Sequence, residues 1–206
     1  MPLDVLGKRV AAHRASCGLS IRQLAGRAMV SKTSIVSLEH GRSCLPATLV
    51  KVCAAMNLHL ERLVDPEDTA QAGPARTHRK GDERWYGLDD FAGGELAQTP
   101  LSEAQRSAIR ANGPDALMTM FRNLPSNSGV LAGVVELTKP TPIRSHPGAE
   151  FVYVLSGRAT VTVDGSEVAL EPGESVYIES MSPHGYASQP DSNDPVSLLI
   201  FRLGGT

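Results

Sequence analysis

Two groups of side chains in this 206-residue sequence have types and spacings that could do chemistry. In the second half, His146 and Glu150 stand four positions apart. On a β-strand, residues separated by an even number point to the same face, so both side chains could face one interior. Imidazole and carboxylate groups are ligands of divalent metal ions. The other group is a set of basic and polar residues in the first third of the chain.

Charge and aromatic residues divide the chain in the same place. The first 64 residues hold nine Lys/Arg and three Asp/Glu, a net charge of +6, whereas the rest holds 11 and 19, a net charge of −8. All nine aromatic residues lie after residue 84. A basic first part on an acidic remainder is typical of a DNA-binding module joined to a module that does not bind DNA. The sequence therefore predicts two domains.

The composition excludes several classes of protein. A hydrophobic fraction of 41% and a charged fraction of 20% are ordinary for a globular protein, which excludes collagen, coiled coils and wholesale disorder. No apolar run approaches the ~18 residues of a membrane span. The N-terminus shows no signal peptide, and the cysteines, Cys17, Cys44 and Cys53, form no CxxC pair. These features predict a cytoplasmic protein without disulfides.

Residues 3–64 carry the apolar periodicity of short helices. Ser20 and Ser31 are suited to cap a second and a third helix. Gly41 is placed to end the third helix, and Pro46 to begin the fourth.

The segment GLSIRQLAGRAMVSKTSIVSLEHGRSCLP resembles the DNA-binding domain of the phage-repressor-like XRE family. The resemblance implies that the third helix enters the major groove of DNA, with flanking residues on phosphates. Glu39 is expected to pair with Arg9 or Arg14 of the first helix. The candidate DNA-binding residues are Arg22, Gln23, Lys32, Thr33, Ser34, Ser37 and Arg42.

Met29 departs from this resemblance, because the family usually has Gly in the turn between the second and third helices. If that turn requires a positive φ, Met29 costs on the order of 1 kcal/mol. The alternative interpretation of the whole segment is a plain helical domain with a solvated basic face.

The remainder of the chain changes from helical to strand patterns. Residues 66–84 are polar and contain proline, which predicts a linker between a domain over 1–65 and a domain over 85–206. Thr99–Gly113 is predicted as a helix with Thr99 as its cap. Short β-branched runs follow from Leu117, and Asp164-Gly165 predicts a hairpin between two of them.

Two motifs in this region resemble the cupin superfamily, whose fold is a small β-barrel. In IRSHPGAEFVYVLSG, His146, Glu150 and Gly157 match the family spacing H-x3-E-x6-G, and LEPGESVYIESMSPH ends on His184. The resemblance implies a metal site made of His146, Glu150 and His184, a set that suits Fe(II) and less selectively Zn, Mn or Ni. The predicted fold is thus α+β and multidomain: an all-α, lambda-repressor-like helix-turn-helix domain followed by an all-β cupin barrel.

Arg144 leaves a second interpretation of the barrel open. Metal-binding cupins usually begin the first motif with H-x-H, and Arg144 replaces the first of those histidines. The site could therefore have lost its metal and bind an anionic small molecule through Arg144 instead. Tyr153 and Tyr186 are candidates to line the mouth of the barrel and contact such a ligand.

The combined resemblance is to bacterial transcription regulators with an XRE domain and a C-terminal cupin sensor. It implies a homodimer that binds double-stranded DNA and a small-molecule effector. The alternative is a mononuclear non-haem iron oxygenase of the hydroxypropylphosphonate epoxidase type, which shares this layout and the run HPGAEF. In that type the helical domain supplies a catalytic Lys, whereas SCGLSIRQ contains none. A third interpretation is a barrel that only dimerises.

Overall fold

The fold comes from a computed structural model, which describes residues 2–56, 58, 60, 63, 74–88, 100–112, 116–124, 129–190 and 195–203. The chain divides into two compact units, residues 1–78 with 122–131, and residues 79–121 with 132–206. The predicted boundaries at 65/66 and 84/85 stay a prediction. Within the described part, no helix is both long and apolar enough to cross a membrane.

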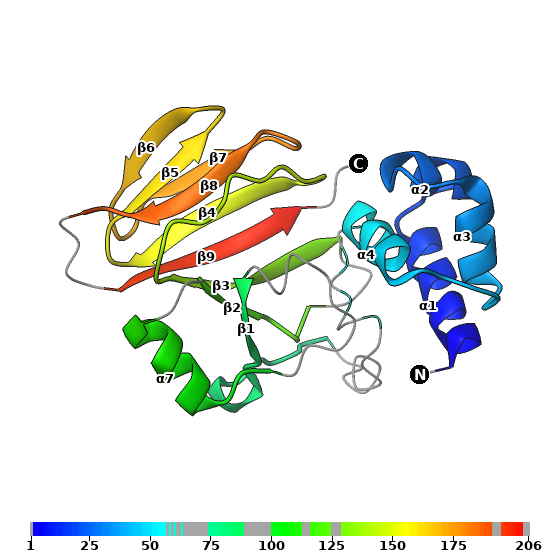
Figure 1. Cartoon of the computed structure of the whole chain (residues 1–206), viewed down its shortest axis with the longest axis horizontal. Helices are drawn as coiled ribbons and strands as arrows, with labels where there is room; N and C mark the ends of the chain where they lie inside the picture. Colours follow the sequence, from blue (N-terminus) through cyan, green and yellow to red (C-terminus); the bar gives the residue numbers. More distant parts are fainter. Residues whose placement is uncertain are drawn as a thin grey trace. The chain divides into compact units, whose positions relative to one another are not determined.

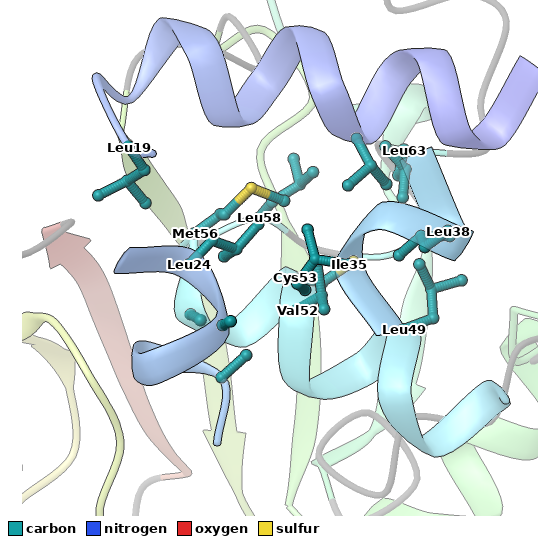
Figure 2. Packing of buried hydrophobic residues seen from close by; sticks show 14 of the residues in the cluster. Leu19, Leu24, Ile35, Leu38, Leu49, Val52, Cys53, Met56, Leu58 and Leu63 are labelled. Atoms are coloured by element: carbon teal, nitrogen blue, oxygen red, sulfur yellow. The ribbon is translucent and has the colours of Figure 1, made fainter. Parts of the chain in front are cut away.

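The first unit is built from four described helices: α1 Leu3–Ser16, α2 Ile21–Arg27, α3 Lys32–Glu39 and α4 Pro46–Ala55 (Figure 1). Apolar side chains from all four helices meet in one core, part of which Figure 2 shows. Leu24, Ile35, Leu38 and Val52 are fully buried there. The predicted helical periodicity is therefore confirmed, because the buried positions lie on one face of each helix.

The predicted helix starts are also confirmed. The Ser20 side chain accepts a hydrogen bond from Gln23 N, and Gln23 Oε1 accepts one from Ser20 N, which forms a capping box. The Ser31 side chain accepts from Ser34 N at the start of α3. Pro46 occupies the start of α4. These bonds satisfy backbone donors that a helix leaves without partners.

Helices α1, α2 and α3 end in the same hydrogen-bonded turn. After α3, Gly41 N donates to Leu38 O and Arg42 N donates to Ser37 O, and Gly41 has φ +64°. This pattern is a Schellman motif, which needs a residue in the left-handed region. Gly18 takes that place after α1 with φ +66°, but Met29 takes it after α2 with φ +51°. The condition stated for Met29, a positive φ in this turn, is thus met.

Replacing Met29 with Gly should raise the free energy of unfolding by about 1 kcal/mol, because glycine adopts a positive φ without a Cβ clash. The Met29 side chain is 81% exposed, so little packing is lost. Urea unfolding followed by circular dichroism measures the change. The matched control is Gly18→Ala, where a Cβ meets nothing within 4 Å and which should lose a similar amount. An unchanged or lower urea midpoint for Met29→Gly would contradict this explanation.

The second unit contains two β-sheets (Figure 1). The larger sheet has the strand order β1-β2-β3-β9-β4-β7 and the smaller one the order β6-β5-β8. The strands are β1 Trp85–Gly87, β2 Leu117–Met120, β3 Val130–Leu137, β4 Ala149–Ser156, β5 Ala159–Val163, β6 Ser166–Leu170, β7 Ser175–Ile178, β8 His184–Ser188 and β9 Val196–Leu203. One apolar core joins side chains from both sheets, including Val152, Val161 and Leu198.

The local elements of this unit agree with the sequence except at one helix. Asp164 and Gly165, with φ +49° and +80°, form the predicted turn between β5 and β6. Helix α7 spans Glu103–Asn112 and begins later than predicted. Ser102 and Gln105 exchange capping hydrogen bonds, so Ser102 provides the start signal. The predicted ends, Thr99 and Gly113, lie outside the described residues. A 3-10 turn, η2 Lys80–Asp82, precedes β1.

Candidate metal centre and DNA-binding surface

His146, Glu150 and His184 come together in the second unit. Their potential ligand atoms all lie within 4.8 Å of one another. His146 Nε2 is 3.1 Å from Glu150 Oε2, and His184 Nε2 is 3.8 Å from Glu150 Oε1. Two ligands bound at adjacent positions on one metal ion lie about 3.0 Å apart, given metal–ligand bonds of ~2.1 Å. The spacing of the three groups therefore suits one metal ion.

The backbone partners of the two histidines also favour a metal ion. His184 Nδ1 lies 2.8 Å from Ser182 O, and His146 Nδ1 lies 3.3 Å from Pro147 O. A carbonyl can only accept, so each Nδ1 donates a proton and each Nε2 can present a lone pair to Glu150. Each Nε2 that faces the carboxylate then needs either a proton or a metal ion between the two atoms, and one divalent metal ion would meet this need for both histidines. These residues thus fit a divalent metal.

Different parts of the unit supply the three side chains. Glu150 lies in β4 of the larger sheet, and His184 begins β8 of the smaller sheet. His146 precedes β4 and belongs to no strand, so the expectation that strand alternation orients it was wrong. Backbone bonds place it instead: Arg144 and His184 exchange two hydrogen bonds, and Met181 N donates to His146 O at 3.0 Å.

Glu150 is buried and strongly partnered. Burial by itself raises the pKa of Glu150, but hydrogen bonds from His146 and Tyr186 and the charges of both histidines outweigh it and leave this pKa below its usual value. Tyr186 donates its hydroxyl to Glu150 Oε1. Burial and the neighbouring carboxylate raise the pKa of Tyr186 well above its usual value, so its hydroxyl stays protonated. The carboxylate is therefore held in the charged form that a metal ligand requires.

Arg202 is a residue of this site that the sequence analysis missed. It lies in β9 directly opposite Glu150. Burial lowers the pKa of Arg202, although the charges of Glu150 and Tyr186 partly offset this effect. Buried residues alternate along β9 at Val196, Leu198 and Ile200. The same alternation, read directly from the sequence, places position 202 on the inner face and could have identified a cation there.

Arg144 and Tyr153, the other two predicted ligand-binding residues, differ in their position relative to the candidate metal ligands. The backbone of Arg144 pairs with that of His184, and Arg144 precedes His146 by two positions, so its backbone lies next to both histidines. Tyr153 alternates with the buried residues Val152 and Val154 of β4, so it lies on the opposite face of that strand from Glu150. The structure therefore brings Tyr186, but not Tyr153, to the histidines and the carboxylate.

The candidate DNA-binding residues lie at the start of α2, in α3 and just after the end of α3. Lys32 and Thr33, its first two residues, are exposed, as are Arg22 and Gln23 on α2 and Arg42 after α3. Ser34 and Ser37 are partly buried. The Ser34 hydroxyl bonds to Ser31 Oγ at 2.8 Å, so it already has a role in the cap. Lys32 and Thr33 are consequently the exposed polar side chains of α3 with the clearest access to a ligand.

An ion pair fixes α3 against α1. Arg14 Nε lies 2.6 Å from Glu39 Oε1, and Arg14 Nη2 lies 2.9 Å from Glu39 Oε2. The hydrogen bond to Glu39 raises the pKa of Arg14. Arg14 Nη1 also donates to Leu19 O, so one side chain ties together three segments. The prediction that Glu39 pairs with a basic residue of α1 is confirmed, with Arg14 as the partner.

Two family models match the chain. A helix-turn-helix model covers residues 10–63, and a cupin-domain model covers residues 133–201. No curated protein matches the sequence. Among solved structures, an HTH_3 family transcriptional regulator from Vibrio cholerae is 20% identical, with a TM-score of 0.44 over 100% of this chain and 98% of that one. Hydroxypropylphosphonic acid epoxidase from S. wedmorenis is 13% identical, with a TM-score of 0.46 over 98% of each chain. The chain therefore carries a helix-turn-helix domain of the HTH_3 family followed by a cupin domain.

Proposed function

We propose that this protein is a sequence-specific DNA-binding transcription regulator whose cupin domain binds a divalent metal and an anionic effector. The observation that carries the proposal is the exposed polar start of α3, at Lys32 and Thr33, within a matched helix-turn-helix domain. A helix of this kind inserts its N-terminal residues into the major groove.

The side chains available at this surface fit both parts of DNA recognition. Lys32 can donate to guanine or to phosphate, and the Thr33 hydroxyl and methyl groups can contact base edges. Arg22 and Arg42 flank α3 and suit phosphate contacts, which fix the orientation on the duplex. One copy would read one half-site, so a homodimer would place two α3 helices about one helical turn apart.

Fluorescence anisotropy on duplex DNA from the chain's own upstream region tests this proposal. Three cations per protomer, at positions 22, 32 and 42, predict a slope of about −5 for log affinity against log salt in a dimer. The double variant Lys32→Ala/Thr33→Ala should lose at least about tenfold in affinity. The matched control is Thr48→Ala/Lys51→Ala on α4. Equal binding by the parent and the α3 variant would contradict the role of α3.

In the second domain, His146, Glu150 and His184 would hold the metal, which would offer open coordination positions to a ligand. The positive charges of the metal, Arg144 and Arg202 exceed the single negative charge of Glu150. The site therefore favours an anionic ligand. If the effector binds more tightly to one arrangement of the two DNA-binding domains, effector binding changes the affinity for DNA. DNA binding then changes the affinity for the effector by the same factor.

The same three ligands support a second candidate function, because a two-His-one-carboxylate set is that of non-haem iron oxygenases. Oxygen consumption by the Fe(II)-loaded protein with a phosphonate distinguishes the two functions. Turnover together with no DNA binding favours the oxygenase. A protein that binds DNA but no metal and no anion would instead have a barrel that only dimerises.

A further inference from the structure

The carbonyl oxygen of Pro147 has an unusual number of donors. Arg202 Nε and Nη2 both point to it, at 3.2 and 3.1 Å. His146 Nδ1 lies 3.3 Å from the same oxygen. One acceptor thus joins a guanidinium group of β9 to the imidazole of a candidate metal ligand.

This connection transmits position to the His146 ring. Proline fixes its own φ and restricts the residue before it to extended conformations, so the peptide between His146 and Pro147 has little freedom. The neighbouring backbone is also held, since Gly148 N donates to Ser180 Oγ at 3.1 Å and Met181 N donates to His146 O. In this segment, the Pro147 carbonyl is the group that both Arg202 and the imidazole contact. The direction of the Pro147 C=O bond therefore sets the orientation of the imidazole ring through Nδ1, and with it the direction in which His146 Nε2 points.

Arg202 could affect a bound metal either through its charge or through the orientation of a ligand. Arg202 lies directly across from Glu150, on the inner side of the sheet. A cation beside a metal site repels the metal and lowers its affinity. Removing the charge alone would therefore strengthen metal binding. Removing a group that orients a ligand weakens metal binding. The two explanations predict opposite signs.

We propose that Arg202 is a positioning residue for the metal site, which orients His146 through the Pro147 carbonyl. The proposal rests on the metal site of the proposed function and adds a residue outside the ligand set. Two parallel donors on a planar group define a direction that a lysine, with its flexible stem, does not reproduce. Arg202→Lys keeps the charge and loses this geometry, whereas Arg202→Gln loses both.

Titration of the metal-free full chain with Co²⁺, followed by its visible absorption, tests the proposal. Both variants should bind Co²⁺ about 10- to 100-fold more weakly than the parent and should show an altered spectrum. The control is Arg158→Gln. Arg158 directly precedes β5, whereas Val163, the residue that pairs with His184, lies at the other end of that strand. The control variant should bind like the parent. Circular dichroism and thermal midpoints confirm that each variant is folded.

The possible outcomes distinguish a failure of the positioning role of Arg202 from a failure of the metal site itself. Tighter binding by Arg202→Gln, or parental affinity and spectrum in Arg202→Lys, would show a charge effect alone and overturn the positioning role. A parent chain that binds no Co²⁺ overturns the metal site itself and this role with it. DNA binding measured on the same samples stays independent of both results.

Discussion

A chain carrying Glu39→Ala should lose about 3 kcal/mol of unfolding free energy in its helical domain. The Glu39 side chain is 7% exposed and that of Arg14 is 17% exposed, so the variant leaves a largely buried guanidinium without its carboxylate. For a domain of this size, such a loss lowers the melting temperature by roughly 10–20 °C. Calorimetry of the full chain measures this change as a shift of the transition assigned to the helical domain.

A double-mutant cycle distinguishes the ion pair from general damage to α3. Arg14→Ala, Glu39→Ala and the double variant are compared, and the double variant should lose much less than the sum of the two single losses. Lys51→Ala, an exposed change on α4, should leave the transition within about 0.5 kcal/mol of the parent. Additive losses, or a Glu39→Ala transition equal to that of the parent, would show that this pair does not hold α3 in place.

Glu150→Gln should remove bound metal from the cupin domain. The change keeps the shape of the side chain and an acceptor for Tyr186, but it removes the anionic member of the three ligands. Because loss of a group outside the ligand set already costs 10- to 100-fold, loss of this ligand should weaken metal binding by more than about 100-fold. Elemental analysis of protein purified without chelator measures the metal content.

The control for this variant lies on the same strand. Tyr153 stands on the opposite face of β4, so Tyr153→Phe should keep the metal content of the parent. A Glu150→Gln protein that is folded and retains the metal at the parental level would contradict the site. In that case the arginines at 144 and 202 would favour the interpretation of a metal-free pocket for an anion.

The features predicted correctly depend on neighbours in the sequence. The caps at Ser20 and Ser31 and the Asp164-Gly165 turn are each set by a few adjacent residues. The positive φ at Met29 follows from its place after α2, and the structure supplies the reason, a Schellman turn that repeats after α1 and α3. Local hydrogen bonds decide these positions, so the sequence alone was sufficient.

The features that the sequence analysis missed depend on tertiary contacts. Alternation could not place His146, because backbone bonds to Met181 and the Arg144–His184 bridge hold it outside the strands. Arg202 is close to Glu150 because β9 pairs with β4 in a particular register, which no local pattern specifies. The start of α7 was misjudged because Thr99 and Ser102 are both residue types that cap helices. Hydrogen bonds between Ser102 and Gln105 form the cap, and the helix begins at Glu103.

The central claim is that α3 reads a DNA sequence, and selection from a random duplex library tests it most directly. We expect the parent chain to enrich one motif, arranged as two half-sites about one helical turn apart or a multiple of it. Lys32→Ala/Thr33→Ala should lose that enrichment, while Thr48→Ala/Lys51→Ala should keep it. A parent chain that enriches no motif, or an α3 double variant that enriches the same motif equally well, would contradict the role of α3 in reading DNA.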